Sequence, residues 1–163
     1  MSVPEPAISL RELFAYSDYL ANRWTGYFKE HPAALDVDVG GKTGTVRNLV
    51  SHIFEVELFF AGSLLREEPA RPSQGKPAAV LVEDLLRLHQ EAQEKLLRYL
   101  ASAGEEELRH KYSFGPVTVT SRKVLAQTAL HSVHHWAQVA MEVRQAGFPA
   151  EKPQDIIITD VME

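Results

Sequence analysis

The sequence contains no cysteine, and this absence restricts the chemistry that the protein can use. The chain cannot form a disulfide, supply a cysteine nucleophile or offer a thiolate to a metal ion. A metal site would therefore depend on histidine and carboxylate side chains, and the chain has 7 histidines and 22 acidic residues to supply them.

An excess of positive charge is also missing. The 163 residues carry a formal net charge of −5, which gives no electrostatic basis for binding nucleic acid or an anionic membrane surface. No apolar run approaches the ~20 residues that cross a bilayer, and the first residues lack the basic segment and apolar core of a secretory signal. We therefore expect a cytoplasmic protein with neither a nucleic-acid nor a membrane partner.

Four segments of the chain show helical periodicity, with apolar residues recurring at intervals of three and four. Ser9 and Glu12 have the spacing of a capping box at the start of the first segment, Thr45 can cap the second, and Gly147 follows the last. The predicted helices cover approximately residues 9–29, 45–66, 82–102 and 121–146.

The connections between these segments contain few strand signals. Residues 36–44 (DVDVGGKTG) predict a glycine-rich loop, and residues 67–77 (EEPARPSQGKP) predict a long crossover loop rather than a domain linker. After Gly115 and Pro116, the alternating residues 117–119 predict a short hairpin before the last helix. The predicted fold is therefore all-α, a four-helix bundle that forms a single domain over residues 1–163.

The last predicted helix carries an unusual group of histidines in the stretch LHSVHHWAQVA, residues 130–140. On a helical wheel His131, His135, Gln138 and Glu142 lie within about 60° of one another, and most of the remaining circumference is apolar. A helix that is apolar over most of its surface is buried on most sides. The polar stripe must therefore face either water or a polar cavity.

A further histidine lies at the margin of the apolar face of the second helix. His52 is either a hydrogen-bonded core residue or a ligand, and the helix alone does not distinguish these roles. If His52 faces the pair on the last helix, three imidazoles could converge on one point. Three neutral nitrogens with an open fourth position form the catalytic type of divalent-metal site.

Several of these motifs resemble the DinB/YfiT-like family of metal-dependent enzymes, and the resemblance extends over the whole chain. The last helix has the spacing His131-x3-His135-x2-Gln138 and continues to the stretch RQAG, residues 144–147. The second helix begins with TVR, residues 45–47, and His52 follows shortly. Where the family pattern has Arg-Gly after the second histidine of the last helix, this chain has Trp-Ala.

The resemblance implies that His52, His131 and His135 bind one divalent ion, which is zinc, nickel or iron(II). It also implies an up-down-down-up order of the helices and a homodimer. The residues Leu130, Val133 and Met141 are candidates for the dimer contact, because the last helix is more apolar than one bundle requires.

The resembled family includes thiol-dependent S-transferases and isomerases that use mycothiol, bacillithiol or glutathione. We therefore expect a metal-dependent transferase acting on a small-molecule substrate, with a low-molecular-weight thiol as cofactor. A metal-bound thiol is deprotonated, and a metal-bound water in a three-histidine site has a pKa of roughly 7. A metal-dependent hydrolase is the alternative enzyme, and a non-enzymatic bundle that binds a metal or small ligand is the other alternative.

The remaining candidates have weaker patterns. His134 points away from the line of His131 and His135, and the other three histidines, at positions 31, 89 and 110, are not expected to be ligands. Glu57 falls inside the apolar face of the second helix and needs a partner, for which we expect an arginine or a tyrosine. Gln138 and Glu142 are expected to support the ligands or to line a pocket. No residue is assigned a catalytic role.

Other metal and hydrolase motifs are missing from the sequence. A ferritin-like di-iron bundle needs two Glu-x-x-His motifs, and only Glu107 and His110 have that spacing. A nucleophile elbow, G-x-S-x-G, and a zincin motif, H-E-x-x-H, do not occur. The sequence therefore excludes a ferritin-like di-iron protein, a Ser-His-Asp hydrolase and a zincin.

Overall fold

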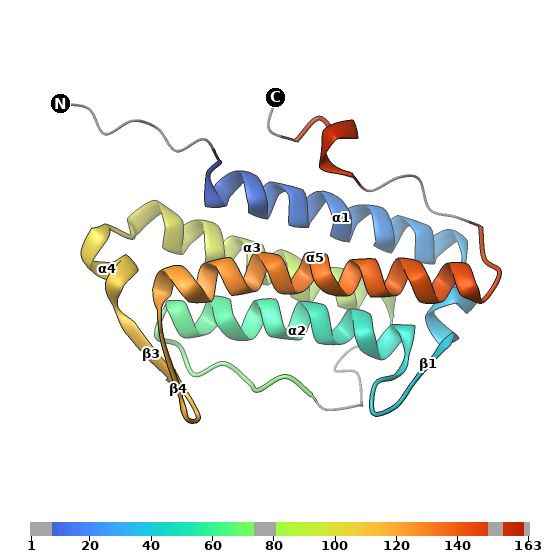
Figure 1. Ribbon diagram of the computed structural model, residues 1–163, viewed down its shortest axis with the longest axis horizontal. Coiled ribbons are helices and arrows are strands. Elements are labelled where there is room, and N and C mark those ends of the chain that lie inside the picture. Colours follow the sequence, from blue (N-terminus) through green and yellow to red (C-terminus); the bar gives the residue numbers. More distant parts are fainter. Residues whose placement is uncertain (1–7, 74–80, 150–154, 162–163) are drawn as a thin grey trace.

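Four long helices dominate the structure, a computed structural model that describes residues 8–73, 81–149 and 155–161 (Figure 1). Each predicted helix is present, and its ends agree with the prediction to within two residues. The long helices are α1 (Leu10–Glu30), α2 (Val46–Leu64), α3 (Val82–Ser102) and α5 (Ser121–Gln145).

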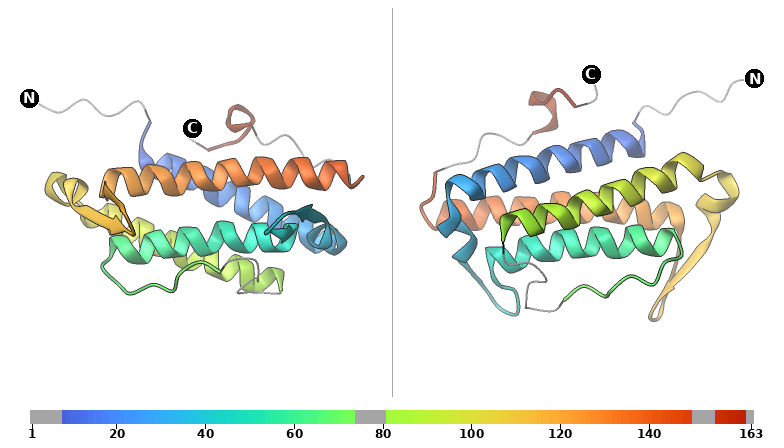
Figure 2. Two further views of the ribbon diagram at one scale, coloured as in Figure 1. Left: turned by 60° about the horizontal axis from the view of Figure 1, so that its bottom comes forward. Right: turned by 180° about the vertical axis from the view of Figure 1, so that it is seen from behind.

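The helices form an up-down-down-up bundle. Helices α1 and α5 run in one direction, and α2 and α3 run in the opposite direction, as the colour gradient of Figure 1 shows. Each of α2 and α1 packs against both α3 and α5, and the view from behind in Figure 2 shows α3 beside α1 and α2. The predicted all-α bundle is therefore confirmed, and none of the described helices is long and apolar enough to cross a membrane.

The predicted capping residues start the helices. Ser9 Oγ accepts a hydrogen bond from the Glu12 amide at 3.2 Å, and the Glu12 carboxylate accepts one from the Ser9 amide at 2.6 Å. Thr45 caps α2 by accepting from the Asn48 amide at 3.3 Å. These bonds satisfy amides that have no partner within the helix, so the caps determine where α1 and α2 begin.

The predicted hairpin is also present, and other small elements accompany it. Strands β3 (Lys111–Phe114) and β4 (Val117–Thr120) pair antiparallel around Gly115, whose φ of 62° favours glycine. The prediction of a simple loop at residues 36–44 is wrong, because three glycines at positive φ form a turn that pairs two short strands. The further elements are β1 (Asp38–Gly40), β2 (Gly44–Thr45), α4 (Glu105–Arg109) and the 3-10 helices at Pro32–Asp36 and Ile156–Ile158.

Two apolar clusters fill the bundle, one in each half of its length. In one of them Trp24 stacks on Trp136, with ring centroids 5.9 Å apart, and Phe54 packs edge-on against Trp136. The other cluster surrounds Phe14 and Leu125. A layer of buried polar side chains separates the two clusters, and each long helix contributes one of its members: Ser17, Glu57, His89 and Ser132.

Glu57 is the centre of this polar layer. One carboxylate oxygen accepts hydrogen bonds from Ser17 Oγ at 3.1 Å and Ser132 Oγ at 2.5 Å, and the other lies 2.6 Å from His89 Nδ1. Glu57 has the partner that its buried position requires, but the expected residue type, an arginine or a tyrosine, is wrong, because the partner is His89. The sequence places His89 on a strongly charged helix, and only the packing shows that its side chain is fully buried.

The charge of His89 follows from its neighbours. Burial alone would lower the pKa of this imidazole, but the Glu57 carboxylate and a hydrogen bond with Asp18 outweigh it and raise the pKa to about 9. Asp18 lies 3.1 Å from Nε2, so both ring nitrogens face a carboxylate. His89 is therefore an imidazolium at neutral pH, and it pairs with the buried charge of Glu57.

Candidate metal centre

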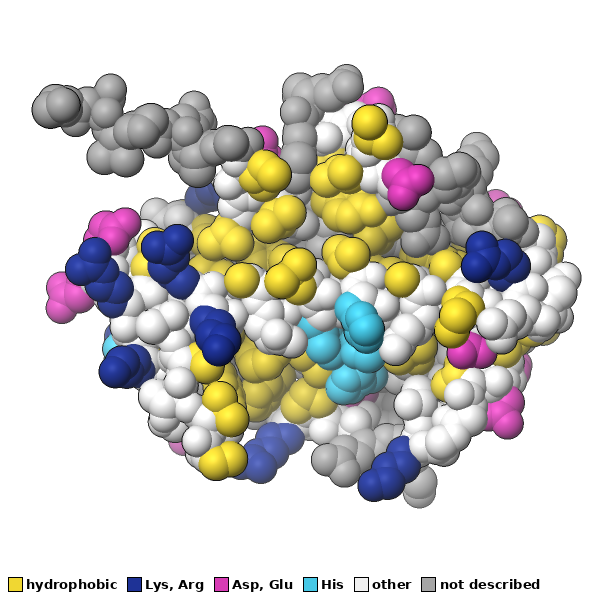
Figure 3. Space-filling view, viewed as in Figure 1, with side chains coloured by type: hydrophobic (Ala, Val, Ile, Leu, Met, Phe, Trp, Pro, Cys, Tyr) yellow, Lys and Arg dark blue, Asp and Glu magenta, His cyan; other side chains and the backbone are white. Residues whose placement is uncertain are grey.

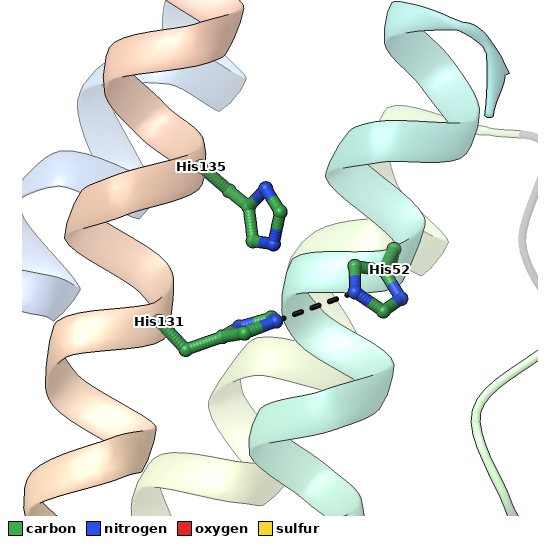
Figure 4. A group of neighbouring side chains, drawn as sticks. All are labelled: His52, His131 and His135. Carbon is green, nitrogen blue, oxygen red and sulfur yellow. Dashed lines mark hydrogen bonds between the residues drawn. The ribbon is translucent and has the colours of Figure 1, made fainter. Parts of the chain in front are cut away.

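Three histidine side chains converge between α2 and α5. His131 and His135 project from successive turns of α5, and His52 projects toward them from α2 (Figure 4). His131 Nε2 lies 3.3 Å from His52 Nε2, and the ring centroids of His131 and His135 are 4.3 Å apart. The packing of α2 against α5 thus brings together two parts of the chain that are 79 residues apart.

The spacing of the ring nitrogens fits a single divalent ion. One ligand nitrogen from each of the three histidines lies within 4.8 Å of the other two. Nitrogens bound tetrahedrally to an ion at about 2.0–2.1 Å are separated by about 3.3–3.4 Å, which is the separation of the His131 and His52 nitrogens. The group could therefore hold a divalent ion after small side-chain rotations.

A hydrogen bond orients one of the three rings. His135 Nδ1 lies 2.5 Å from Gln138 Oε1, so Nδ1 carries the proton and Nε2 keeps its lone pair. This arrangement is typical of metal-ligating histidines, whose second nitrogen donates to a nearby oxygen. Gln138 thus supports the cluster as predicted, whereas Glu142 makes no hydrogen bond to these three histidines within the described residues.

All three imidazoles are neutral at pH 7. Burial lowers the pKa of His52 and of His135. Burial, together with the neighbouring His135 and His52, lowers the pKa of His131 to about 3. A histidine nitrogen must lose its proton before it binds a metal ion. Because these three imidazoles are already neutral, protons do not compete with a metal ion for them at pH 7.

The other four histidines lie outside this group. His134 is exposed, His31 packs against Tyr27, and His110 packs against Tyr112. His89 belongs to the buried polar layer. Among the described residues, His52, His131 and His135 are the only set of three whose ligand atoms approach one another closely enough to share an ion.

A pocket of about 1240 Å³ opens beside His52. It lies between α2, the segment that follows α2, the β3–β4 hairpin and the first turns of α5. Figure 3 shows a hollow with hydrophobic walls next to the histidine cluster. The sequence does not reveal this pocket, because no local signal shows that the hairpin and the crossover segment enclose one side of α2.

Glu55 holds the crossover segment in place, and this residue was not recognised from the sequence. Its side chain is buried, and its carboxylate accepts hydrogen bonds from Ser51 Oγ at 2.6 Å and Ser73 Oγ at 2.6 Å. The Ser73 amide donates a further bond at 2.5 Å. The segment that contains Ser73 is thereby tied to the turn of α2 that follows His52.

The family model described as the DinB family matches residues 7–155. Among the curated proteins, none matches this chain. The family match spans all four long helices and includes His52, His131 and His135. This chain belongs to the DinB family.

Proposed function

We propose that the protein is a metal-dependent enzyme in which His52, His131 and His135 bind one divalent ion, zinc, nickel or iron(II). The observation that carries this proposal is the convergence of three neutral imidazoles, from two helices, at the edge of a large pocket. A structural metal site normally has four protein ligands, and the three-histidine set leaves one position for water or a small ligand.

The reaction we propose is the attack of a low-molecular-weight thiol on an electrophilic carbon of a small substrate, in which the S–C bond forms as the bond to the leaving group breaks and the thiol proton passes to solvent. An ion at this site would supply a Lewis acid that holds the sulfur as a thiolate. Gln138 orients His135, the other two histidines complete the ligand set, and the apolar walls of the pocket exclude water from the sulfur. We also propose a cytoplasmic location, because low-molecular-weight thiols are kept reduced in that compartment.

The carboxylate whose charge acts on His52 is already engaged by hydrogen bonds. A hydrolase generally uses a positioned base to activate water. The carboxylate whose charge acts on His52 is that of Glu55, and its oxygens already accept hydrogen bonds from Ser51 and Ser73. A thiol held as a thiolate needs no such base, and we propose thiol transfer as the reaction; a metal-bound water with a pKa of roughly 7 would also act without one, so hydrolysis is the alternative.

The proposal can be tested with protein loaded separately with zinc, nickel or iron(II). Mycothiol, bacillithiol and glutathione are each offered with monochlorobimane, and thiol conjugation is followed by fluorescence. We expect one thiol to be consumed in a metal-dependent reaction that His131→Ala abolishes. Metal-dependent hydrolysis of p-nitrophenyl acetate without any thiol would instead support the hydrolase. Stoichiometric metal with neither activity would support a non-enzymatic metal-binding bundle.

We further propose that the protein forms a homodimer through the outer face of α5. Leu130 is 64% exposed on this face, and Val133 and Met141 are also exposed. Such a group of apolar side chains is costly to leave in water. Light scattering should give about twice the 18.3 kDa mass of one chain, and Leu130→Glu should reduce the mass to that of a monomer. A monomer mass for the unmodified protein at working concentration would refute the proposal.

A further inference from the structure

The pocket beside the metal centre extends away from the histidines along one face of α2. His52, Val56, Phe59 and Phe60 follow one another along this face at intervals typical of one side of a helix. The opposite wall includes Phe114 of the β3–β4 hairpin. Of the three histidines, His52 lines the pocket, and it lies at one end of the lining that α2 provides.

The walls of the pocket are aromatic. The ring of Phe114 lies 5.7 Å from that of Phe59 and 5.4 Å from that of Phe60, measured between centroids. All three side chains are only partly buried and line the pocket, and Phe60 and Phe114 also pack against the apolar cluster around Phe14 and Leu125. These surfaces fit the apolar body of an organic molecule, and an aromatic ring in particular.

Two of the three Lys and Arg side chains in the pocket lining form no ion pair within the described residues. Arg66 is paired with Glu107 at 2.8 Å, and Glu67 is bound by two cations of α3. Three charged side chains then remain that form no ion pair within the described residues: Arg71, Lys123 and the single acid Glu68. These three side chains therefore carry a net positive charge at the rim of the pocket.

Lys123 also has a defined position relative to the metal centre. It lies in the first turn of α5, eight residues before His131. That interval corresponds to a rise of about 12 Å along the helix, and the amides at the start of the helix add a partial positive charge there. One end of the pocket thus carries His52, and the other attracts an anion.

We infer that the pocket binds an amphipathic organic anion, whose apolar body packs on the three phenylalanines and whose carboxylate or sulfonate lies near Lys123. This inference rests on the proposed function, because the anion that it describes is the substrate of the proposed metal-dependent reaction. The reacting atom of such a molecule lies at the His52 end, about 8–12 Å from its anionic group.

The binding test uses the metal-free protein, so it does not depend on the metal or on turnover. 4-Phenylbutyrate and 4-phenyl-1-butanol share the same apolar body and differ in charge. Each is titrated into isotope-labelled protein, and its affinity is measured from the chemical shifts of backbone amides. We expect shifts centred on Phe60 and Phe114, with the carboxylate binding about three- to fivefold more tightly than the alcohol.

Two variants that each remove one positive charge distinguish binding in the pocket from binding to the general surface. Lys123→Gln should remove most of the preference for the carboxylate, and Arg122→Gln should retain it, because Arg122 is exposed and does not line the pocket. Equal affinity for the two probes, an equal effect of both variants, or shifts away from the pocket would each overturn the inference. A failure of the proposed function would appear separately, as an absence of bound metal or of thiol conjugation.

Discussion

Alanine in place of His52, His131 or His135 is expected to abolish stoichiometric metal binding, whereas His134→Ala should leave it nearly unchanged. Each of the three residues contributes one ligand nitrogen to a group spanning no more than 4.8 Å, and two ligands alone hold an ion poorly. Loss of even a supporting hydrogen-bond partner of a ligand typically costs 10–100-fold in metal affinity, so loss of a ligand should cost more than about 100-fold.

The measurement is metal content by mass spectrometry after loading with one equivalent of zinc and removal of the excess. His134 is the matched control, because it is an exposed histidine on the same stretch of α5 and lies outside the group. Thermal unfolding of the metal-free variants tests whether the fold is intact. If His134→Ala lowers the metal content as much as His131→Ala does, the three histidines do not form the site.

The largest expected effect on stability comes from the buried polar layer. His89→Ala should lower the free energy of unfolding by about 3–5 kcal/mol, because it leaves the carboxylate of Glu57 buried without its cation. Arg109→Ala is a suitable control, since its ion pair with Glu105 is highly exposed and should contribute less than about 0.5 kcal/mol. Chemical denaturation at pH 7 measures both changes.

A double variant distinguishes the loss of a charge partner from the loss of packing. If Glu57 and His89 are both replaced by leucine, the buried charges disappear together and a substantial part of the stability should return. Should the double variant be less stable than His89→Ala alone, the contribution of the pair would come from its hydrogen bonds with Ser17 and Ser132 rather than from charge pairing.

The same layer predicts how stability depends on pH. The pKa of His89 is raised from 6.5 to about 9, so its contribution is fully present below pH 6.5 and is lost as the pH rises through about 9. The free energy of unfolding should therefore fall between pH 7 and pH 10. This fall should be much smaller in the variant with leucine at both positions, and an equal fall in both proteins would contradict the assignment.

The polar layer also restrains the orientation of one of the three clustered histidines, His131. Ser132 donates to Glu57 and directly follows His131 on α5. Because successive helical residues differ by 100° in direction, the bond that directs Ser132 into the bundle restrains the side toward which His131 projects. The buried polar layer and the three-histidine group therefore share the same short stretch of α5, through neighbouring residues with different partners.

Most helix boundaries of this protein follow from the sequence by itself. The capping box of Ser9 and Glu12, the cap at Thr45 and the hairpin turn at Gly115 depend on interactions that span only a few residues. The placement of His131 and His135 on one side of a helix is equally local, since it follows from the helical repeat. A local interaction forms in the same way wherever the helix packs, and so it can be predicted without the fold.

Other features were decided only by the tertiary structure. From the sequence alone, His52 could be either a hydrogen-bonded core residue or a metal ligand. Only the packing of α2 against α5 brings its Nε2 within 3.3 Å of His131 Nε2. The partner of Glu57 was predicted wrongly, because His89 lies 32 residues away on a helix whose sequence is mostly charged. The pocket depends in the same way on segments that are distant in the chain. The alignment and rotation of whole helices determine which distant side chains meet, and these result from the packing of many apolar residues at once.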